Sequence, residues 1–446
     1  MGNDGAHIEL YNPQVEKPEE LYNFHVESGK SALFHAARIS GPTDLNGGEF
    51  TVKDLRHGAT LMIAGMIARG VTTLQIIFVE DTNLLMRHFR QWVLILKKAI
   101  MHQLSFILGI LIFSFVITSI FIVPFINTLY GLRFRRAKQK TIDAFGQRTP
   151  IFDKFHNSKA GIPVGGGLLV IMVVSILFVI IFPLIRLFGI QVTSAYDLNK
   201  EMNVLFFTFL SFGMLGLYDD VKKFFHFEKE QFFGLRIQHK LTLQVILAFI
   251  ISCLLYFNLG ISFLNIPFIG TFHMGMLFIP FAMFVIVSFT NAVNITDGLD
   301  GLAGGVLMIS LFGLWYLSAR ILDVPISMFL ALWLGSLISF LYFNIFPARL
   351  FMGDVGALAF GATLAVVGLM VGKVVALLVI GFIFVFEIFT AAAQLLSKKV
   401  RKKKLFPVAP FHLWLQKYGW EEPKIVQRAW LLQIMLTLFG VWLAML

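Results

Sequence analysis

Runs of apolar residues separated by short polar segments fill the chain from Leu104 to its C-terminus. Each run has roughly the 17–25 residues that a helix needs to cross a hydrocarbon core about 30 Å thick. Ten such runs lie at about 104–129, 164–188, 202–218, 241–258, 275–292, 303–319, 326–343, 355–371, 374–396 and 428–446. The pattern predicts an all-α polytopic membrane protein with ten transmembrane helices. Between the fourth and fifth runs, Pro267 and Gly270 predict an external turn or short hairpin over 259–274.

The first hundred residues depart from this pattern, because they are polar and mixed in character. We therefore expect two domains, a small soluble fragment over 1–100 and a ten-helix membrane domain over 101–446. Apolar and basic positions over 84–98 predict an amphipathic helix that lies at the membrane interface and leads into the first span.

Composition supports the membrane class. Hydrophobic residues make up 57% of the chain and charged residues 14%, which is too little polar surface for a soluble protein of this length. The net charge of +11 does not indicate nucleic-acid binding, because Lys and Arg lie mostly in short loops between apolar runs. The single cysteine, Cys253, falls inside an apolar run, which excludes disulfides and a thiolate metal site.

Loop charge also orients the predicted spans. Lys and Arg concentrate in alternate loops, at 131–163, 219–240, 344–354 and 397–427. The opposite loops offer little beyond Lys200, Arg320 and Lys373. Cytoplasmic loops carry this excess of positive charge in membrane proteins, so we expect the first set to face the cytoplasm.

Polar side chains suited to chemistry gather in these same loops. Acids, amides, a lysine and glycines come from four separate places: Lys159 with Gly165–Gly167, Asp219 with Asp220, Asn294 with Asp297 and Asp300, and Asn344 with Asp354. Carboxylate and amide oxygens suit Mg²⁺, which usually takes one or two protein ligands together with substrate phosphates. Lysines and backbone N–H groups balance the remaining phosphate charge, and a carboxylate without metal can deprotonate or position an acceptor. The convergence predicts a cytoplasmic site where a nucleotide meets a lipid phosphate.

Each motif also has a structural interpretation. Asp219 and Asp220 are compatible with a solvated helix end. Asp297 and Asp300 would share a helical face, or the glycines around them would make a turn. Asp354 could cap the helix that follows it, and glycines 165–167 are typical of close helix packing in membranes.

One further acid, Glu387, lies near the middle of the ninth run and shares a helical face with Gln394. An acid inside the membrane indicates function by default. A buried, hydrogen-bonded structural glutamate is the alternative.

Specific strings are spread over about 104–446. They are Ser158–Pro163, the Asp219-Asp220 loop, Gly234–Lys240 with Gln244, Asn291–Leu302, Phe343-Asn344, Phe351–Asp354, Gly372-Lys373, Glu387 with Gln394, and Gly419–Arg428. Together they resemble the polyprenyl-phosphate N-acetylhexosamine-1-phosphate transferases, and most closely the phospho-N-acetylmuramoyl-pentapeptide branch of that superfamily.

The resemblance implies ten transmembrane helices around a cytoplasmic active-site cleft, in a homodimer embedded in the lipids of the bacterial inner membrane. The implied reaction is Mg²⁺-dependent and belongs to peptidoglycan synthesis. It moves phospho-N-acetylmuramoyl-pentapeptide from UDP-N-acetylmuramoyl-pentapeptide to undecaprenyl phosphate, and yields lipid I and UMP.

Roles for single residues are implied in the same way. Asp354 and Asn294 would bind Mg²⁺, and Asp219 would act as a base or position the lipid phosphate. The catalytic set would be completed by Asp220 and Asp297. Polar side chains from several loops would line the substrate pocket: Lys159, Lys222, Lys240, Asn294, Asp300, Asn344, Gln394 and His412.

Two departures from the family pattern leave the sugar open. Three consecutive histidines are usual in the last cytoplasmic loop, whereas Pro410–Trp414 contains His412 alone. The usual Gly-Thr-Pro-Thr-Met-Gly-Gly string is here Gly161–Gly167, which lacks both hydroxyls. A sister enzyme that transfers N-acetylglucosamine 1-phosphate to a polyprenyl phosphate is therefore an alternative. A secondary transporter is a third, disfavoured because transporters place their polar site near the bilayer midplane.

Residues about 8–92 resemble a second family, the UDP-N-acetylglucosamine enolpyruvyl transferases, through strings between Arg38 and Thr73. The likeness covers a late fragment of that two-domain α/β enzyme, and it would assign Asp54 and Arg56 to the uridine nucleotide. The fragment lacks the rest of the cleft and a cysteine nucleophile, so we expect no enolpyruvyl transfer. A structural remnant, a laboratory fusion or a misjoined reading frame is favoured over a second active site.

Overall fold

A computed structural model describes residues 7–11, 36–40, 49–52, 73–76, 82–135, 159–188, 192–225, 235 and 237–446. The chain divides into two compact units, Met1–Ile100 and Met101–Leu446. In the first unit, β1 (His7–Tyr11) pairs antiparallel with β2 (Ala36–Ser40), and β3 (Glu49–Val52) pairs parallel with β4 (Thr73–Ile76). Asp54 and Arg56, the residues assigned to a uridine nucleotide, lie outside the described residues.

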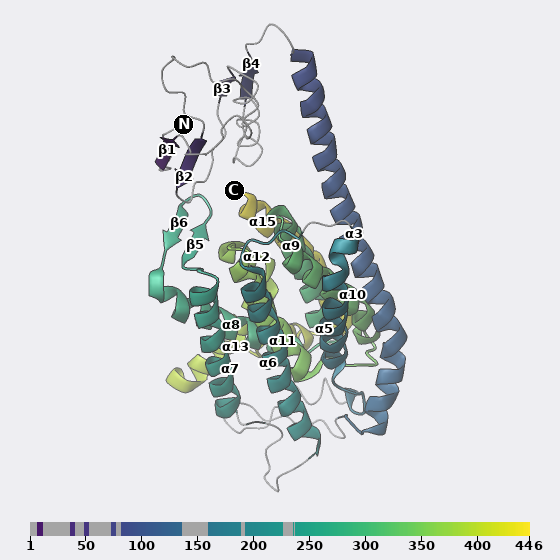
Figure 1. Ribbon diagram of the computed structural model, residues 1–446. Helices are drawn as coiled ribbons and strands as arrows, with labels where there is room; N and C mark the ends of the chain where they lie inside the picture. The colour runs from purple at the N-terminus through teal and green to yellow at the C-terminus, as the bar shows by residue number, and fades with distance from the viewer. Residues whose placement is uncertain are drawn as a thin grey trace, which may run out of the picture. The chain divides into compact units, whose positions relative to one another are not determined.

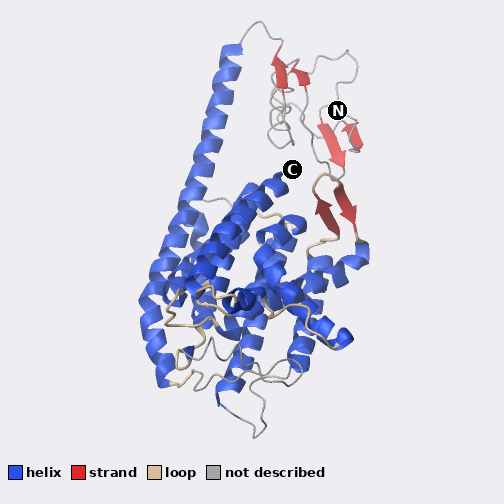
Figure 2. Cartoon of the chain, turned by 180° about the vertical axis from the view of Figure 1, so that it is seen from behind, coloured by secondary structure: helices blue, strands red, loops and turns tan. Residues whose placement is uncertain are grey.

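Helices build nearly all of the described second unit (Figures 1 and 2). In chain order they are α3 (Thr82–Gly131, which begins in the first unit), α5 (Gly166–Leu184), η2 (Ile185–Phe188), α6 (Leu198–Phe225), α7 (Ile237–Cys253), the π-helical turn η3 (Leu254–Asn258), η4 (Gly275–Leu277), α8 (Phe278–Thr296), α9 (Leu302–Arg320), α10 (Val324–Asn344), α11 (Gly353–Met370), α12 (Val374–Ile380), α13 (Phe382–Arg401), α14 (Phe411–Lys417) and α15 (Glu422–Met445). Between η3 and η4, β5 (Phe263–Ile266) and β6 (Gly270–His273) form an antiparallel hairpin, which confirms the hairpin predicted over 259–274.

The hydropathy pattern locates the spans correctly. Nine helices in the described part of the chain are long and apolar enough to cross a membrane, and α12 with α13 makes a tenth if the pair is one span. The ninth predicted span is not straight, because α12 and α13 meet at an angle of 80°. Gly381 lies at this bend, where a Cβ atom would come within 2.6 Å of the Phe289 ring. The small residue lets α8 pack into the bend.

The first predicted span is part of a longer helix. The segment 84–98 and the span 104–129 form one continuous helix, α3. Placement of 84–98 at a membrane interface stays a prediction.

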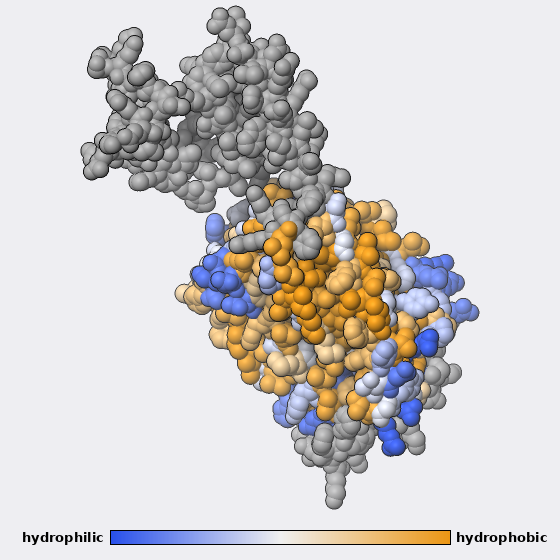
Figure 3. Space-filling view, turned by 45° about the vertical axis from the view of Figure 1, so that its right-hand side comes forward, coloured by the Kyte–Doolittle hydropathy of each residue, from blue (hydrophilic) through white to orange (hydrophobic). Residues whose placement is uncertain are grey.

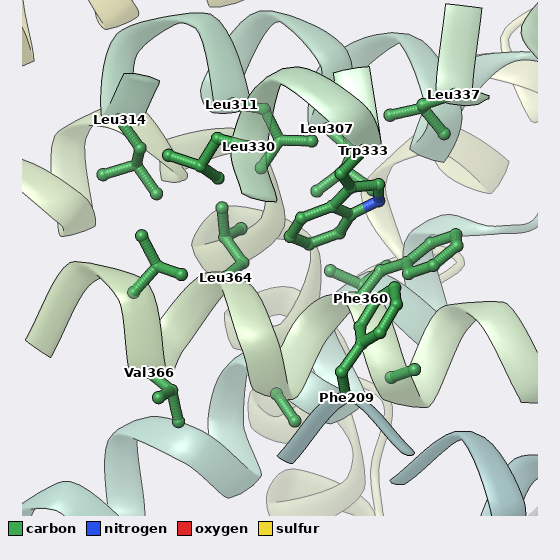
Figure 4. Close-up of a cluster of buried hydrophobic side chains, with 14 of the residues drawn as sticks. Phe209, Leu307, Leu311, Leu314, Leu330, Trp333, Leu337, Phe360, Leu364 and Val366 are labelled. Atoms are coloured by element: carbon green, nitrogen blue, oxygen red, sulfur yellow. The ribbon is translucent and has the colours of Figure 1, made fainter. Parts of the chain in front are cut away.

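Two central helices form the core. In α10 and α11, 94% of the apolar window is buried, and α11 packs against α5, α6 and α8. Trp333 of α10 packs against Phe209 of α6 and Phe360 of α11, with ring centroids 5.6 and 5.3 Å away, and these two phenylalanine rings also contact each other (Figure 4). Hydrophobic side chains also cover most of the described surface seen in Figure 3, as contact with lipid requires.

Small residues allow α11 to approach its neighbours closely. A Cβ atom at Gly167 of α5 would lie 2.2 Å from the Gly356 Cα atom, and one at Gly216 of α6 would lie 2.2 Å from the Asp354 carbonyl oxygen. Close approach through glycine is the usual basis of helix packing in membranes. The packing interpretation of the glycines at 165–167 is therefore confirmed for Gly167.

We expect Gly216→Ala to destabilise the protein, because the added methyl group would collide with the α11 backbone. The loss should be about 1–3 kcal/mol, the usual cost of overpacking. Thermal unfolding in detergent measures it. Gly109→Ala in α3 is the matched control, since a Cβ there meets nothing within 4 Å, and its melting temperature should not fall. Equal melting temperatures for the two variants would contradict the close contact.

Candidate active site

The C-terminal end of α6 carries two buried acids and a lysine. Asp219 and Asp220 are each about 1% exposed, although they lie near the end of the helix. Lys223, one helical turn later, places its Nζ 3.0 Å from Asp219 Oδ2 and 3.6 Å from Asp220 Oδ1. The interpretation of these acids as a solvated helix end is therefore wrong.

A third acid, Asp354, joins them from the start of α11. The Val355 N–H donates to Asp220 Oδ2 at 3.0 Å, which fixes the beginning of α11 against α6. Gly353 adopts a φ of +79°, and a Cβ there would lie 2.7 Å from Asp220 Oδ2, so this position requires glycine. The N-cap residue of α11 is Met352 and Asp354 lies inside the first turn, so the cap interpretation is wrong.

Two lysines connect these acids. Lys223 Nζ lies 2.7 Å from Asp354 Oδ2, and Lys240 of α7 contacts the same oxygen and lies 3.1 Å from Asp219 Oδ2. The Leu235 N–H donates to the other oxygen of Asp219 at 2.7 Å. We call Asp219, Asp220, Asp354, Lys223 and Lys240 the aspartate cluster.

Helix α8 brings an amide to the aspartate cluster. Asn294 Nδ2 donates to Asp354 Oδ1 at 3.2 Å. One turn earlier, Asn291 Nδ2 donates to Gln244 Oε1 of α7 at 2.7 Å and joins the two helices. The structure thus brings the two predicted metal ligands, Asp354 and Asn294, into contact.

The turn after α8 contains the other predicted acids. Asp297 is the C-terminal cap residue of α8 and is half-buried, and α9 begins only at Leu302. Asp297 and Asp300 therefore lie in a turn, as the glycine interpretation had it, and do not share a helical face. Asp300 Oδ2 accepts from the Ala348 N–H at 2.9 Å.

A second ion-pair group stands beside this turn. Lys159 Nζ lies 2.7 Å from Asp300 Oδ1 and 2.6 Å from Glu422 Oε1, and Glu422 also accepts from the Asp300 N–H. We call Lys159, Asp300 and Glu422 the lysine bridge. All three side chains are at least 90% buried. The positive charge of Lys159 is therefore shared between two carboxylates in this structure.

Asn344 supports the turn from α10. Its Oδ1 accepts from the Gly301 N–H at 3.2 Å, and its Nδ2 donates to the Leu350 carbonyl at 2.9 Å. It is nearly fully buried. Its visible role is to hold the α8–α9 turn against the segment that leads to Asp354.

His412 reaches the same turn from α14. Its Nδ1 lies 3.1 Å from Glu387 Oε2, and its backbone N–H donates to Glu387 Oε1 at 3.1 Å. In the tautomer that carries its proton on Nδ1, the ring would donate to this carboxyl group. Nε2 then faces Gly298, where a Cβ atom would lie 2.6 Å from it. Glu387 thus orients the one histidine that the resemblance placed in the pocket.

The structure gives less direct support for Gln394 and Lys222 as pocket residues. Gln394 Oε1 accepts from the N–H groups of Leu405 and Phe406, and its Nε2 donates to the Phe406 carbonyl, so it shapes the loop before α14. Lys222 is partly exposed on α6, next to Lys223. Substrate contact by either residue stays a prediction.

Two residues of the site, Lys223 and Glu422, were not selected from the sequence. Lys223 could have been found, because the i, i+4 spacing from Asp219 places the pair on one helical face. Glu422 had no such signal, since it lies 263 positions from Lys159.

Comparison with known proteins agrees with this arrangement. The model of the glycosyl transferase family 4 matches residues 202–372, which include the whole aspartate cluster and the α8–α9 turn. A phospho-N-acetylmuramoyl-pentapeptide-transferase of Clostridium perfringens strain 13 is 34% identical over 321 residues, 71% of this chain and 92% of its own length. Enzymes of the same name from Desulfotalea psychrophila and Lactobacillus helveticus are each 35% identical, over 64% and 61% of this chain and 80% of their own lengths. On these similarities the chain belongs to the phospho-N-acetylmuramoyl-pentapeptide transferase family.

Proposed function

We propose that this protein transfers phospho-N-acetylmuramoyl-pentapeptide from its UDP nucleotide to undecaprenyl phosphate, forming lipid I and UMP for peptidoglycan synthesis. The observation that supports the proposal is the aspartate cluster. In it, buried acids from two helices share two largely buried lysines. The relatives compared above are named for the transfer of the same group.

Charge balance explains why such a cluster suits this substrate. With all five side chains charged, three carboxylates and two ammonium groups leave one net negative charge and a nucleotide diphosphate adds more, so binding the substrate would require a further cation. Lys223 and Lys240, which share Asp354 Oδ2, are placed to exchange this carboxylate for a phosphate oxygen. Ammonium groups held in a low-dielectric site stabilise developing phosphate charge far better than they would in water.

The donor set fits Mg²⁺. Asp354 offers carboxylate oxygens and Asn294 an amide oxygen, and no group of three His, Cys, Asp or Glu side chains in the described part of the chain would hold a metal alone. Asn294 here turns its Nδ2 toward Asp354 Oδ1, so a bound ion would replace this hydrogen bond and draw the amide oxygen toward the carboxylate. Mg²⁺ commonly takes one or two protein ligands and completes its shell with substrate phosphates and water. We propose that Asp354 and Asn294 hold the ion, which would neutralise phosphate charge at the reacting phosphorus.

We propose that Asp219 positions the attacking lipid phosphate. Its two oxygens are fixed by Lys223, Lys240 and the Leu235 N–H. The proposed step forms a bond from a lipid-phosphate oxygen to the sugar-linked phosphorus, and the bond to UMP breaks with its electron pair on UMP. Through the shared lysines Asp219 would orient the attacking phosphate, and it would take the proton of a phosphate that arrives protonated.

We further propose that the protein lies in the bacterial inner membrane as a homodimer, with the aspartate cluster facing the cytoplasm. Lys-rich segments flank the cluster end of the helices, as the positive-inside rule expects of cytoplasmic loops. A transport function has weaker support. The broken pair α12–α13 is transporter-like, but the acids of the aspartate cluster gather at the ends of α6 and α11.

The direct test measures UMP release by purified protein with undecaprenyl phosphate, Mg²⁺ and each UDP sugar in turn. We expect release with the muramoyl-pentapeptide nucleotide and its loss when EDTA removes the metal. Asp354→Asn should lower turnover about 10³-fold, because it removes charge from the reacting centre. Asp197→Asn is the control: Asp197 accepts from the Lys200 N–H at the opposite end of α6, and asparagine caps a helix equally well. Release only with UDP-N-acetylglucosamine would overturn the proposed substrate.

Lys223→Ala should lower kcat/KM about 10²-fold, because it removes one of the two ammonium groups shared by the acids. Lys222→Ala, its neighbour in sequence, should cost less than about tenfold on the same scale. Steady-state kinetics with both substrates decides between them. Equal losses would show that Lys222 also reaches the substrate, as the resemblance implies.

The lysine bridge predicts coupling between distant residues. Lys159→Gln and Glu422→Gln should each raise KM for the nucleotide, because either change releases the α8–α9 turn. The double variant should be less impaired than the two single losses combined, with a coupling energy of about 0.5–3 kcal/mol. Glu421→Gln, the exposed neighbour on the same turn, should leave KM unchanged. Independent effects would mean that Lys159 acts on the substrate without Glu422.

A further inference from the structure

The β5–β6 hairpin lies at the end of the helices away from the aspartate cluster. Lys240 stands near the start of α7 and Asn294 near the end of α8, and the hairpin joins the other ends of these two helices. β5 also contacts α12. The hairpin is thus rooted in three segments of the membrane domain.

The surrounding sequence is unusual for a connection between spans. From Leu241 to Thr296 the chain contains no Asp, Glu, Lys or Arg. The other described connections at this end carry charge, with Asp197 before α6, Arg320 before α10 and Lys373 before α12. Charge is what a loop in water normally presents, so its absence here indicates a different environment.

Large apolar side chains stand exposed on this uncharged connection. Phe268 and Ile269 at the hairpin tip are each 80% exposed, and Phe272 on β6 is 59% exposed. Met276 and Leu277 of η4 continue the patch at 71% and 68% exposure. A contiguous apolar surface of this kind marks contact with a membrane or a partner.

The height of the hairpin favours the membrane. In both Figure 1 and Figure 2 the hairpin rises to about the level reached by the C-terminal end of α15. α15 is one of the membrane spans, and its last turns expose Trp442, Met445 and Leu446. The apolar tip therefore lies level with the apolar end of a lipid-facing helix and does not project beyond it into water.

We propose that the β5–β6 hairpin is a membrane anchor, with Phe268, Ile269 and Phe272 inserted at the boundary between head groups and acyl chains of the leaflet opposite the aspartate cluster. A two-stranded sheet leaves backbone groups unpaired along its edges, which the hydrocarbon core does not tolerate. Phe and other large apolar side chains of interfacial segments bury at the boundary between head groups and acyl chains, where the backbone groups can still reach water. The apolar patch therefore contacts lipid, and the hairpin inserts only to the depth of the head-group boundary.

Cys253 is the single cysteine of the chain, so replacing it leaves a background in which one introduced cysteine can be labelled. In a Cys253→Ser background, Ile269→Cys and, separately, Phe272→Cys are labelled with the fluorophore NBD and reconstituted into vesicles of phosphatidylethanolamine and phosphatidylglycerol. Quenching is measured with aqueous iodide and with lipids that carry a doxyl group at carbon 5 or carbon 12. Lys200→Cys at the same end of the bundle is the aqueous control, and Phe439→Cys on the exposed face of α15 is the lipid control.

We expect both hairpin labels to be quenched at least twofold more by the 5-doxyl than by the 12-doxyl lipid, and to resist iodide as the Phe439 label does. Iodide quenching equal to that of the Lys200 label would overturn the anchor. Protection from all quenchers would also overturn it, since protein, either a second copy or residues 1–100, would then cover the tip. Two labelled positions keep the test decisive if one variant fails to fold. The outcome does not depend on the proposed function.

Discussion

The close contact between α6 and α11 is the constraint on which the rest of the site depends. Gly216 and Gly353 let the two backbones meet, and the Val355 N–H closes the contact by donating to Asp220. Without side chains in between, acids near the end of one helix and the start of another come within reach of the same lysines. Buried like charges would otherwise repel, so packing and ion pairing stabilise each other here.

Helix α8 connects the aspartate cluster to the lysine bridge. Asn294 meets Asp354, and the turn that follows within a few residues is held by Lys159, Asn344 and Glu422. The lysine bridge closes only when α15, the last helix, is in place. Trp430 of α15 also donates to the Gly301 carbonyl. Late segments of the chain therefore fix a turn that lies in its middle.

Much of the fold was accessible from sequence, because hydropathy and span length follow directly from the bilayer. The ten apolar runs and the hairpin at 259–274 were predicted close to their observed bounds. The 80° bend between α12 and α13 was not, because apolar composition continues across Gly381 and only the packing of Phe289 marks the break. Convergence of Asp219, Asn294 and Asp354 was predicted from loop alternation. Lys223 was not selected, although its i, i+4 spacing from Asp219 indicates the pair. The pairing of Lys159 with Glu422 could not be read from sequence, since no local period connects residues so far apart.

The position of Asn294 and Asp297 on a single helix end has a geometric consequence. One helical turn separates them, and a turn is a stiff spacer of about 5 Å. A group bound at Asn294 and another bound at the following turn are thus held at a set separation. Under the proposed function, the end of α8 would therefore set the distance between a phosphate group bound beside Asn294 and the part of the substrate that contacts the α8–α9 turn.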